Sequence, residues 1–534
     1  MYAKLINSYS ISLRIRTNCF DIGLAVIFEV ILNHELNLPM PTIFRELFAT
    51  LLILVLLTSN LQCQQGQKPP NVLFIAVDDL RTELGIYGHP VVKSPNMDAI
   101  ASEGSVFNNH FVQVPTCGAS RYALLTGMRP KKPAHLKNSA IEDEISGKKE
   151  NDIPESFIHQ LKRNGYYTVG IGKISHSADG LVYGYEEPVS TKKELPYSWD
   201  ELLFNPGKWG TGWNAFFAYA NGENRQSLRK QVKPYEAGEV NDKGYPDGLT
   251  TQLAIAKLRE LKDKKSPFFM GVGFFKPHLP FNAPKKYWDL YDREEIPVSP
   301  NPNIPENISL KSLHDSGEFN GYALGDEHPK LSEPASIDYA KKLGHAYLAS
   351  ISYIDAQIGM IWDELKALGL DKNTILVIWG DHGWHLGDQR VWGKHTLFEN
   401  ALNSALIIRS PFEEHRNKNI KTIVETVDIY PTIMEMCRID MKHNIDGESF
   451  RDSFIADKPN TDQVAYSYFR NGISLRTDRY RLTKYFREEE PTVELYDHVS
   501  DPYETKNIAQ INQDIVQSLM PLLEKGNTGL YEGD

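Results

Sequence analysis

Four apolar runs along the chain each end in polar or charged side chains. The runs cover residues 72–77, 167–171, 268–274 and 375–379. Continuous runs of β-branched and aromatic residues are typical of strands buried on both faces, as in a parallel sheet. Helical patterns alternate with the runs, at 97–103, 153–164, 250–262 and 337–368. This alternation predicts an α/β fold with a doubly wound, mostly parallel sheet.

The polar ends of the four runs are expected to meet in one cleft. Ligands of a doubly wound sheet gather at the carboxyl ends of its strands. The residues at those ends are Asp78 and Asp79, Lys173 and His176, Lys276 and His278, and Asp381 and His382. The sequence therefore predicts a functional site at this edge of the sheet.

The pattern changes after about residue 460. Short alternating runs at 464–470, 473–476, 480–486 and 493–496 predict a small antiparallel sheet. Segments 181–249 and 289–336 are rich in glycine, proline and aromatic residues and have weak periodicity, so they are interpreted as loops and excursions. We expect three parts, listed in chain order: an N-terminal extension with a signal peptide (1–65), a catalytic α/β domain (66–459) and a C-terminal subdomain (460–534).

The N-terminal extension contains a targeting signal. Residues 48–57 form an apolar run that follows Arg45 and precedes the polar segment 59–65. The run is short for a membrane span and matches the apolar region of a signal peptide, with Met40 as a possible true start. We therefore expect an exported protein, periplasmic or secreted, with no transmembrane span in the mature chain. A lipoprotein anchor at Cys63 is the alternative.

Composition excludes some classes of function. The 534 residues carry a net charge of −11 and no basic stripe, so nucleic-acid binding is not expected. The four cysteines have neither metal-site nor disulfide-framework spacing: Cys19, Cys63, Cys117 and Cys437. Cys437 lies in the apolar stretch TIMEMCRI and is interpreted as a buried structural thiol.

The stretch PTCGASRYALLTG contains the most informative motif. Cys117 precedes a small-residue turn, Arg121 follows one helical turn later, and an apolar run comes next. This order predicts a reactive group at a helix N-terminus, where backbone N–H groups and the helix dipole favour an anion. The plainer alternative is a buried thiol with a surface arginine. Cys-x-(Pro/Ala)-x-Arg followed by Leu-Leu-Thr-Gly resembles the signature of the type I sulfatases.

The resemblance extends over about residues 69–510. It includes Asp78-Asp79-Leu80-Arg81, Ser94-Pro95-Asn96-Met97-Asp98 and Asp381-His382-Gly383-Trp384, and it is strongest to the iduronate-2-sulfatase branch. It implies an alkaline-phosphatase-like fold and a sulfuric ester hydrolase. It also implies that Cys117 is oxidised to formylglycine (3-oxoalanine), whose hydrated aldehyde attacks the sulfate ester. Ala119 stands where the more familiar motif has proline, which leaves open the partner for maturation: a formylglycine-generating enzyme or an anaerobic sulfatase-maturating enzyme.

Two acidic strand ends indicate a metal site. Several carboxylates with an imidazole suit calcium and are compatible with magnesium, although one Asp-Asp pair alone is as easily a capping turn. The resemblance implies that one Ca²⁺ is coordinated by five residues: Asp78, Asp79, modified Cys117, Asp381 and His382. The metal would acidify the formylglycine hydrate and polarise a sulfate oxygen.

The remaining candidates are cations and imidazoles. Sulfate-ester hydrolysis needs cations around the non-bridging oxygens, and Arg121, Lys173 and Lys394 match family positions. Imidazoles with a pKa near neutrality suit acid–base work. The resemblance implies that His176 contacts the formylglycine hydroxyl and helps eliminate sulfate, and that His278 and Lys394 serve the leaving alcohol. The other histidines are either ambiguous (His385, His395) or interpreted as structural (His110, His345, His443).

These features lead to one main hypothesis and two alternatives. The main hypothesis is a calcium-dependent sulfatase that acts on a uronic-acid-containing polysaccharide, ulvan-like or glycosaminoglycan, or on its oligosaccharides. Trp209 and Trp213 are candidates for stacking on sugar rings, with core packing as the plainer role. The first alternative is a phosphatase or phosphodiesterase of the alkaline-phosphatase superfamily, which usually has a serine or threonine nucleophile and two zinc ions. The second is a non-catalytic carbohydrate-binding protein on the same fold.

Overall fold

The computed structural model describes residues 68–182, 190–413, 418–441, 443–455, 460 and 462–531. The predicted signal run, Cys19, Met40 and Cys63 lie outside these residues, so export and the Cys63 anchor stay predictions. Within the described part of the chain, no helix combines the length and the apolar character that crossing a membrane requires.

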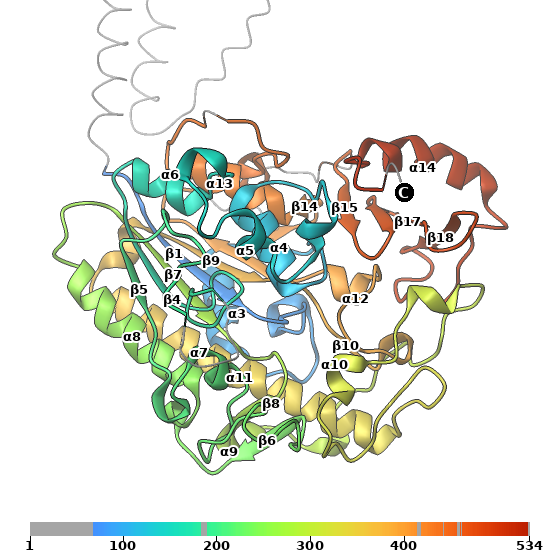
Figure 1. The fold of residues 1–534 in the computed structure, drawn as a ribbon, viewed down its shortest axis with the longest axis horizontal. Helices are drawn as coiled ribbons and strands as arrows, with labels where there is room; N and C mark the ends of the chain where they lie inside the picture. The colour runs from blue at the N-terminus through green and yellow to red at the C-terminus, as the bar shows by residue number, and fades with distance from the viewer. Residues whose placement is uncertain are drawn as a thin grey trace, which may run out of the picture. The chain divides into compact units, whose positions relative to one another are not determined.

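The centre of the molecule is an eight-stranded sheet with the strand order β13-β2-β12-β9-β1-β7-β4-β5 (Figure 1). Its four middle strands are parallel neighbours and are the four predicted runs: β9 (Thr374–Gly380), β1 (Asn71–Val77), β7 (Phe268–Phe274) and β4 (Tyr167–Gly172). The outer strands are β13 (Asn419–Ile420), β2 (Ser105–Phe107), β12 (Leu406–Arg409) and β5 (Glu201–Leu203). Strand β12 runs antiparallel to both of its neighbours. The mostly parallel α/β sheet is confirmed.

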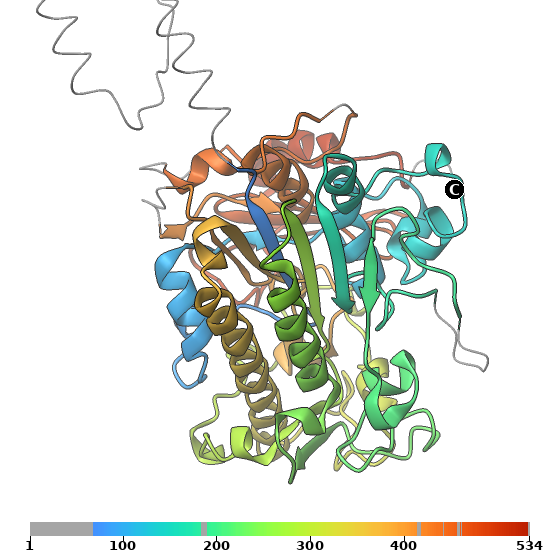
Figure 2. The ribbon, with the colours of Figure 1, turned by 90° about the vertical axis from the view of Figure 1, so that its left-hand side faces the viewer.

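Alternate residues of β1 enter two separate cores, because successive side chains of a strand point to opposite faces. Leu73, Ile75 and Val77 pack with helices α3 (Pro95–Glu103), α8 (Pro246–Leu261) and α11 (Ile337–Ala367). Helices α8 and α11 lie side by side on this face (Figure 2).

The opposite face of β1 carries Val72, Phe74 and Ala76. They join a second core with residues of α4 (Cys117–Thr126), α5 (Ala140–Glu144), α6 (Phe157–Arg163) and α13 (Ile429–Met436). Both faces of the sheet are therefore covered by helices, as the continuous apolar runs indicate.

Two predicted helix starts are shifted in the structure. Helix α6 begins at Phe157 and not at Ile153, because Pro154 keeps the residue before it extended and the Ser156 hydroxyl caps the helix by accepting from His159 N. Helix α8 begins at Pro246, one turn before the predicted start, since proline is well accommodated in the first helical turn.

The two excursions differ from each other. Segment 181–249 is not only loop: it includes β5, the short helix α7 (Gly212–Phe216) and β6 (Tyr235–Gly238), which pairs with β8 (Phe281–Pro284). Elements of three to five residues are too short to show a period. Segment 289–336 is mostly irregular, as expected, apart from 3₁₀ turns and the single-turn helix α10 (Gly317–Asn320).

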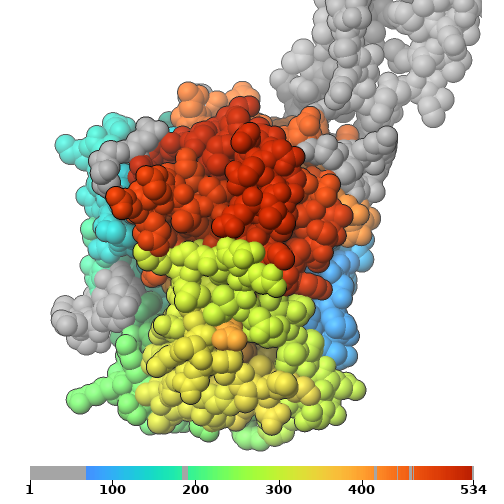
Figure 3. Space-filling view, turned by 90° about the vertical axis from the view of Figure 1, so that its right-hand side faces the viewer, coloured from blue at the N-terminus to red at the C-terminus, as the bar shows by residue number. Residues whose placement is uncertain are grey.

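The predicted antiparallel sheet is present near the C-terminus. Its four strands lie in chain order: β15 (Ala465–Tyr468), β16 (Gly472–Arg476), β17 (Tyr480–Tyr485) and β18 (Thr492–Asp497). Helix α14 (Gln513–Lys525) packs on this sheet. Figure 3 shows this C-terminal part against the 289–336 excursion, where Glu306 N donates to Thr505 O at 2.9 Å.

Candidate active site

The carboxyl ends of the four central strands converge on one cavity. Asp78 follows β1, Lys173 follows β4, Lys276 follows β7 and Asp381 follows β9. The cavity has a volume of about 380 Å³, and its lining includes five predicted site residues: Cys117, Lys173, His176, His278 and Lys394. The expected meeting of polar strand ends is therefore seen in the structure.

Cys117 is the first residue of α4 and lies in the wall of this cavity. Its side chain is buried, with Sγ 3.2 Å from His382 Nε2 and 3.4 Å from Lys394 Nζ. The next residue must be glycine, because a Cβ on Gly118 would lie 2.1 Å from the Asn138 carbonyl oxygen. Asn138 Oδ1 also accepts from Gly118 N at 3.0 Å, which fixes the start of the helix.

A buried set of possible metal ligands surrounds Cys117. Ligand atoms of Asp78, Cys117, Asp381 and His382 all lie within 4.8 Å of one another. Asp78 Oδ1 is buried and has no hydrogen-bond partner among the described residues, with Arg121 Nη2 3.9 Å away. A buried carboxylate oxygen without a partner is costly unless a cation or donor meets it, so this atom fits a metal ion.

Asp79 lies beside this set rather than in it. Its Oδ1 is 3.0 Å from Lys394 Nζ and 3.2 Å from His382 Nδ1, and it forms a second group with Cys117 and His278. The backbone of Asp79 has a φ of 60°, a left-handed conformation that aspartate tolerates better than most residues. Asp79 N donates to Asp381 Oδ1 at 3.0 Å, which joins the two acidic strand ends.

Arg121 points toward the carboxylates and does not line the cavity. Its Nε donates to Asp381 Oδ2 at 2.9 Å, and Nη1 donates to the carbonyl oxygens of Lys173 and Ile174. The guanidinium is fully buried, so the alternative of a surface arginine is wrong. Lys173 does line the cavity, and its Nζ lies 2.5 Å from Asp78 Oδ2.

The two predicted acid–base histidines line the cavity, but near-neutral pKa values are not found. Burial and the Lys394 ammonium lower the pKa of His278 to about 4. Burial and Lys173 place the pKa of His176 well below its usual range. Desolvation and a nearby cation both disfavour the imidazolium form. Both rings are therefore neutral at pH 7.

Glu318 is a site residue that the sequence did not indicate. It lies on α10, with Oε1 3.1 Å from His278 Nε2 and Oε2 3.5 Å from Lys394 Nζ. The other ring nitrogen of His278 is 2.7 Å from the Leu279 carbonyl oxygen, so the ring is fixed from both sides. No periodicity or motif marks Glu318, because it belongs to the irregular 289–336 segment.

The remaining histidine and tryptophan candidates differ in whether they line the cavity. His395 lines the cavity and stacks on Phe469 at 5.5 Å between ring centroids. His385 is buried outside the cavity lining, with Nε2 2.7 Å from Thr396 Oγ1. Trp213 lines the cavity. Trp209 is only 4% exposed and donates to a backbone carbonyl, so core packing is its role.

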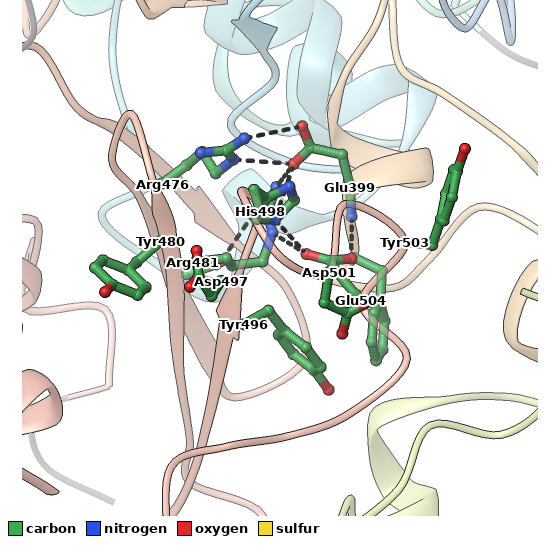
Figure 4. Close-up of polar contacts among 12 residues, drawn as sticks. Glu399, Arg476, Tyr480, Arg481, Tyr496, Asp497, His498, Asp501, Tyr503 and Glu504 are labelled. Atoms are coloured by element: carbon green, nitrogen blue, oxygen red, sulfur yellow. Dashed lines mark hydrogen bonds and ion pairs between the residues drawn. The ribbon is translucent and has the colours of Figure 1, made fainter. Parts of the chain in front are cut away.

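A second acid–histidine group lies away from the cavity, around Glu399, His498 and Glu504 (Figure 4). Two arginines already neutralise its carboxylates: Arg481 Nε is 2.6 Å from Glu504 Oε1, and Arg476 Nε is 3.1 Å from Glu399 Oε2. The group is therefore an ion-pair network. It joins strands of the C-terminal sheet to α12 (Glu399–Leu402), which begins five residues after Lys394.

Glu194, in the cavity wall, provides a test of the electrostatics of the site. It accepts from Ser177 N at 2.9 Å, and burial raises its pKa from 4.5 to about 7. A raised pKa in the folded state stabilises the protein below pH 4.5, and this contribution is lost as pH rises through 7. In the wild-type protein, Glu194 should lower the free energy of unfolding by roughly 3 kcal/mol between pH 4.5 and 8. We expect Glu194→Gln to lack this decrease.

Urea unfolding of both proteins at several pH values measures this difference. The comparison isolates Glu194, because every other titrating group is common to the two chains. An identical pH dependence for wild type and variant would contradict the assignment.

The fold and this site define a hydrolase of the alkaline-phosphatase-like α/β class. A family model described as "Sulfatase" matches residues 70–439, and one described as "N-sulphoglucosamine sulphohydrolase, C-terminal" matches residues 380–528. The chain belongs to the sulfatase family and is a sulfuric ester hydrolase.

Two relatives and one solved structure illustrate the relationship. Iduronate 2-sulfatase of Mus musculus is 30% identical over 433 residues, 74% of each chain. A sulfatase of Formosa agariphila is 30% identical over 494 residues, 87% of this chain and 88% of its own. A solved protein in complex with D-glucosamine-2-N,6-O-disulfate has a TM-score of 0.65 at 22% identity, over 88% of this chain and 99% of its own. The resemblance to the iduronate-2-sulfatase branch is thereby confirmed.

Proposed function

We propose that this sulfatase hydrolyses sulfate esters of an acidic carbohydrate by means of formylglycine at position 117 and one calcium ion. The observation that carries the proposal is the buried group of Asp78, Cys117, Asp381 and His382 at the inner end of a cavity lined by Lys394 and other cations. A reactive residue, hard metal ligands and sulfate-binding cations thus lie within one small volume.

The residues that would hold the metal are Asp78, Asp381, His382 and residue 117, with Asp79 beside them. Asp78 Oδ1, which accepts no hydrogen bond from the described residues, and the predominance of carboxylates support a hard cation such as Ca²⁺. When bound, the metal supplies positive charge that polarises a sulfate oxygen. Arg121 then serves as a positioning residue, because it fixes Asp381 through a 2.9 Å hydrogen bond.

The chain's own cations would bind and orient the sulfate. Lys173 and Lys394 line the same cavity as Cys117, and Lys394 Nζ is 3.4 Å from its Sγ. The formylglycine hydrate would supply one hydroxyl that attacks the sulfur atom and a second whose deprotonation re-forms the aldehyde and expels sulfate with the first oxygen. The low pKa of His176 keeps its ring neutral, and a neutral ring can accept a proton from that second hydroxyl.

His278 would serve the leaving alcohol. A sulfate ester beside the ring would add negative charge, raise the pKa of His278 from about 4 and favour its protonated form. Nε2, which faces Glu318 at 3.1 Å, then carries the proton that passes to the ester oxygen. Lys394 stabilises the same developing charge.

We propose a uronic-acid-containing substrate, either an ulvan-like polysaccharide or a glycosaminoglycan, or oligosaccharides of these. The relation to iduronate 2-sulfatase and the aromatic side chains of the wall, such as Trp213, support a sugar ligand. A cavity of about 380 Å³ suits a single sulfated sugar, so removal of sulfate from a chain end fits better than internal attack. Action outside the cytoplasm, in the periplasm or secreted, and conversion of Cys117 by a maturation enzyme complete the proposal.

The two alternatives fit the site less well. The phosphatase usually needs two zinc ions with extra histidines, whereas the described residues around Cys117 offer ligands mainly of the carboxylate type. A binding protein has no need for Lys173, His176, His278 and Lys394 around one reactive position.

The test is a substrate panel with protein co-produced with a formylglycine-generating enzyme. We expect sulfate release from oligosaccharides that bear a sulfated non-reducing end to exceed release from the intact polymer. Equal rates on both would contradict action at chain ends. Activity restricted to simple aryl or alkyl sulfates would contradict the carbohydrate substrate, and faster hydrolysis of phosphate esters would favour the phosphatase.

A further inference from the structure

One cation of the cavity wall has no carboxylate partner in the part of the chain that the structure describes. Arg225 lines the cavity, and its Nε has no hydrogen-bond partner among the described residues. The buried arginines Arg121 and Arg481, in contrast, are each paired with carboxylates at 2.6–2.9 Å. Within the described ranges Arg225 forms no ion pair at 4.0 Å or less.

Aromatic rings position the Arg225 guanidinium. Its Cζ lies 3.6 Å from the ring centroid of Phe217 and 5.2 Å from that of Tyr322. The backbone N–H of Arg225 donates to Phe217 O at 3.2 Å, which closes the loop that carries it. Stacking on ring faces leaves the N–H edge of a guanidinium available for a planar anion.

The two lysines of the cavity wall are already paired with carboxylates. Lys173 pairs with Asp78, and Lys394 pairs with Asp79 and Glu318. Of the other carboxylates in the wall, Glu194 accepts from a backbone N–H, and Glu142 also lines the cavity. A sulfate ester that reaches Cys117 meets Lys173 and Lys394, whereas Arg225 belongs to a different segment, the 181–249 excursion.

We propose that Arg225 binds a second anionic group of the substrate, a carboxylate or a second sulfate, on the sugar whose sulfate ester is cleaved. The guanidinium fork matches the oxygens of either group. A cavity of about 380 Å³ limits the distance between the two anions to roughly one sugar ring. The inference rests on the proposed function and makes Arg225 its specificity-determining residue.

The experiment compares three sugars that share one scissile sulfate. The first carries a carboxylate, the second has that carboxylate reduced to a hydroxymethyl group, and the third carries an added sulfate on the reduced sugar. We expect Arg225→Gln to lower the ratio of kcat/KM for the anionic sugar to that for the neutral sugar about 10- to 100-fold. Arg225→Lys keeps the charge but not the fork, so its loss should be smaller.

Arg229→Gln is the matched control, because Arg229 is an exposed arginine of the same loop. It should leave the ratio unchanged. A lower ratio for the sugar with the carboxylate identifies the bound anion as a carboxylate, and a lower ratio for the sugar with the added sulfate identifies it as a sulfate. Equal losses on all three sugars, or an unaltered ratio in Arg225→Gln, would overturn the inference while sulfate release itself continues. Wild-type enzyme that releases sulfate from none of these sugars would instead overturn the proposed function.

Discussion

Replacing Cys117 with alanine is expected to lower sulfate-ester turnover about 10⁴-fold or more while the protein stays folded. The reason is that the proposed nucleophile is made from this side chain, which lies at the inner end of the cavity beside His382 and Lys394. Alanine removes only the sulfur atom and is readily accommodated in the first turn of α4. Circular dichroism and thermal unfolding check the fold, and sulfate release under single-turnover conditions checks the activity.

The same position should carry an aldehyde in active wild-type protein. Peptide mass spectrometry and labelling with a hydrazide reagent measure the converted fraction, which should rise in proportion to specific activity. Cys437→Ala is the matched control, because Cys437 is the other buried thiol among the described residues and lies away from the cavity. Fully active protein with only unmodified cysteine at position 117 would contradict this mechanism. Cys117→Ser should be inactive unless the maturation enzyme accepts serine.

Loss of the metal is expected to have the second-largest effect. Chelation should abolish turnover, and added calcium should restore it. Asp381→Asn should weaken calcium binding and lower turnover together, by about 100-fold or more. Asp381 is chosen among the proposed ligands because its two oxygens also fix Arg121 Nε at 2.9 Å and Asp79 N at 3.0 Å. The substitution therefore removes a ligand charge and leaves the buried guanidinium of Arg121 without its closest carboxylate partner.

Elemental analysis and calcium titration measure the metal, with initial rates recorded on the same samples. Asp363→Asn on the solvent side of α11 is the matched control, since the side chain of Asp363 is 73% exposed. Stoichiometric zinc in active protein, without calcium or magnesium, would favour the phosphatase. Undiminished calcium binding by Asp381→Asn would remove Asp381 from the ligand set.

The central part of the site could be predicted from sequence because two simple rules apply there. A continuous apolar run marks a strand buried on both faces, and the residue after such a strand lies at the ligand-binding edge. Asp78, Lys173, His278 and Asp381 all follow from these rules, and the helix start at Cys117 follows from its motif.

The walls of the cavity could not be predicted in the same way. Glu318 and Arg225 lie in irregular segments whose course is set by long-range contacts, so neither periodicity nor spacing indicates them. The sequence also does not predict the partner of the Arg121 side chain, because a motif gives the position of a residue along a helix but not the groups that its side chain contacts. The lowered pKa of His278 results from burial in the folded protein, and the residue's type and sequence position do not predict that burial.

The ion-pair network of Glu399, Arg481 and Glu504 has an evolutionary consequence. These residues come from three separate segments, and in a largely buried setting Arg481 pairs with both carboxylates while Arg476 balances the remaining charge of Glu399. A change in one member alone leaves an unmatched buried charge and lowers the free energy of unfolding by about 3–5 kcal/mol. Such a loss is a large part of the total stability of a protein, so single changes are expected to be selected against. The three positions should therefore covary among relatives. Recombinants that exchange the C-terminal sheet should retain activity only when the donor and recipient share the same charge pattern at these sites.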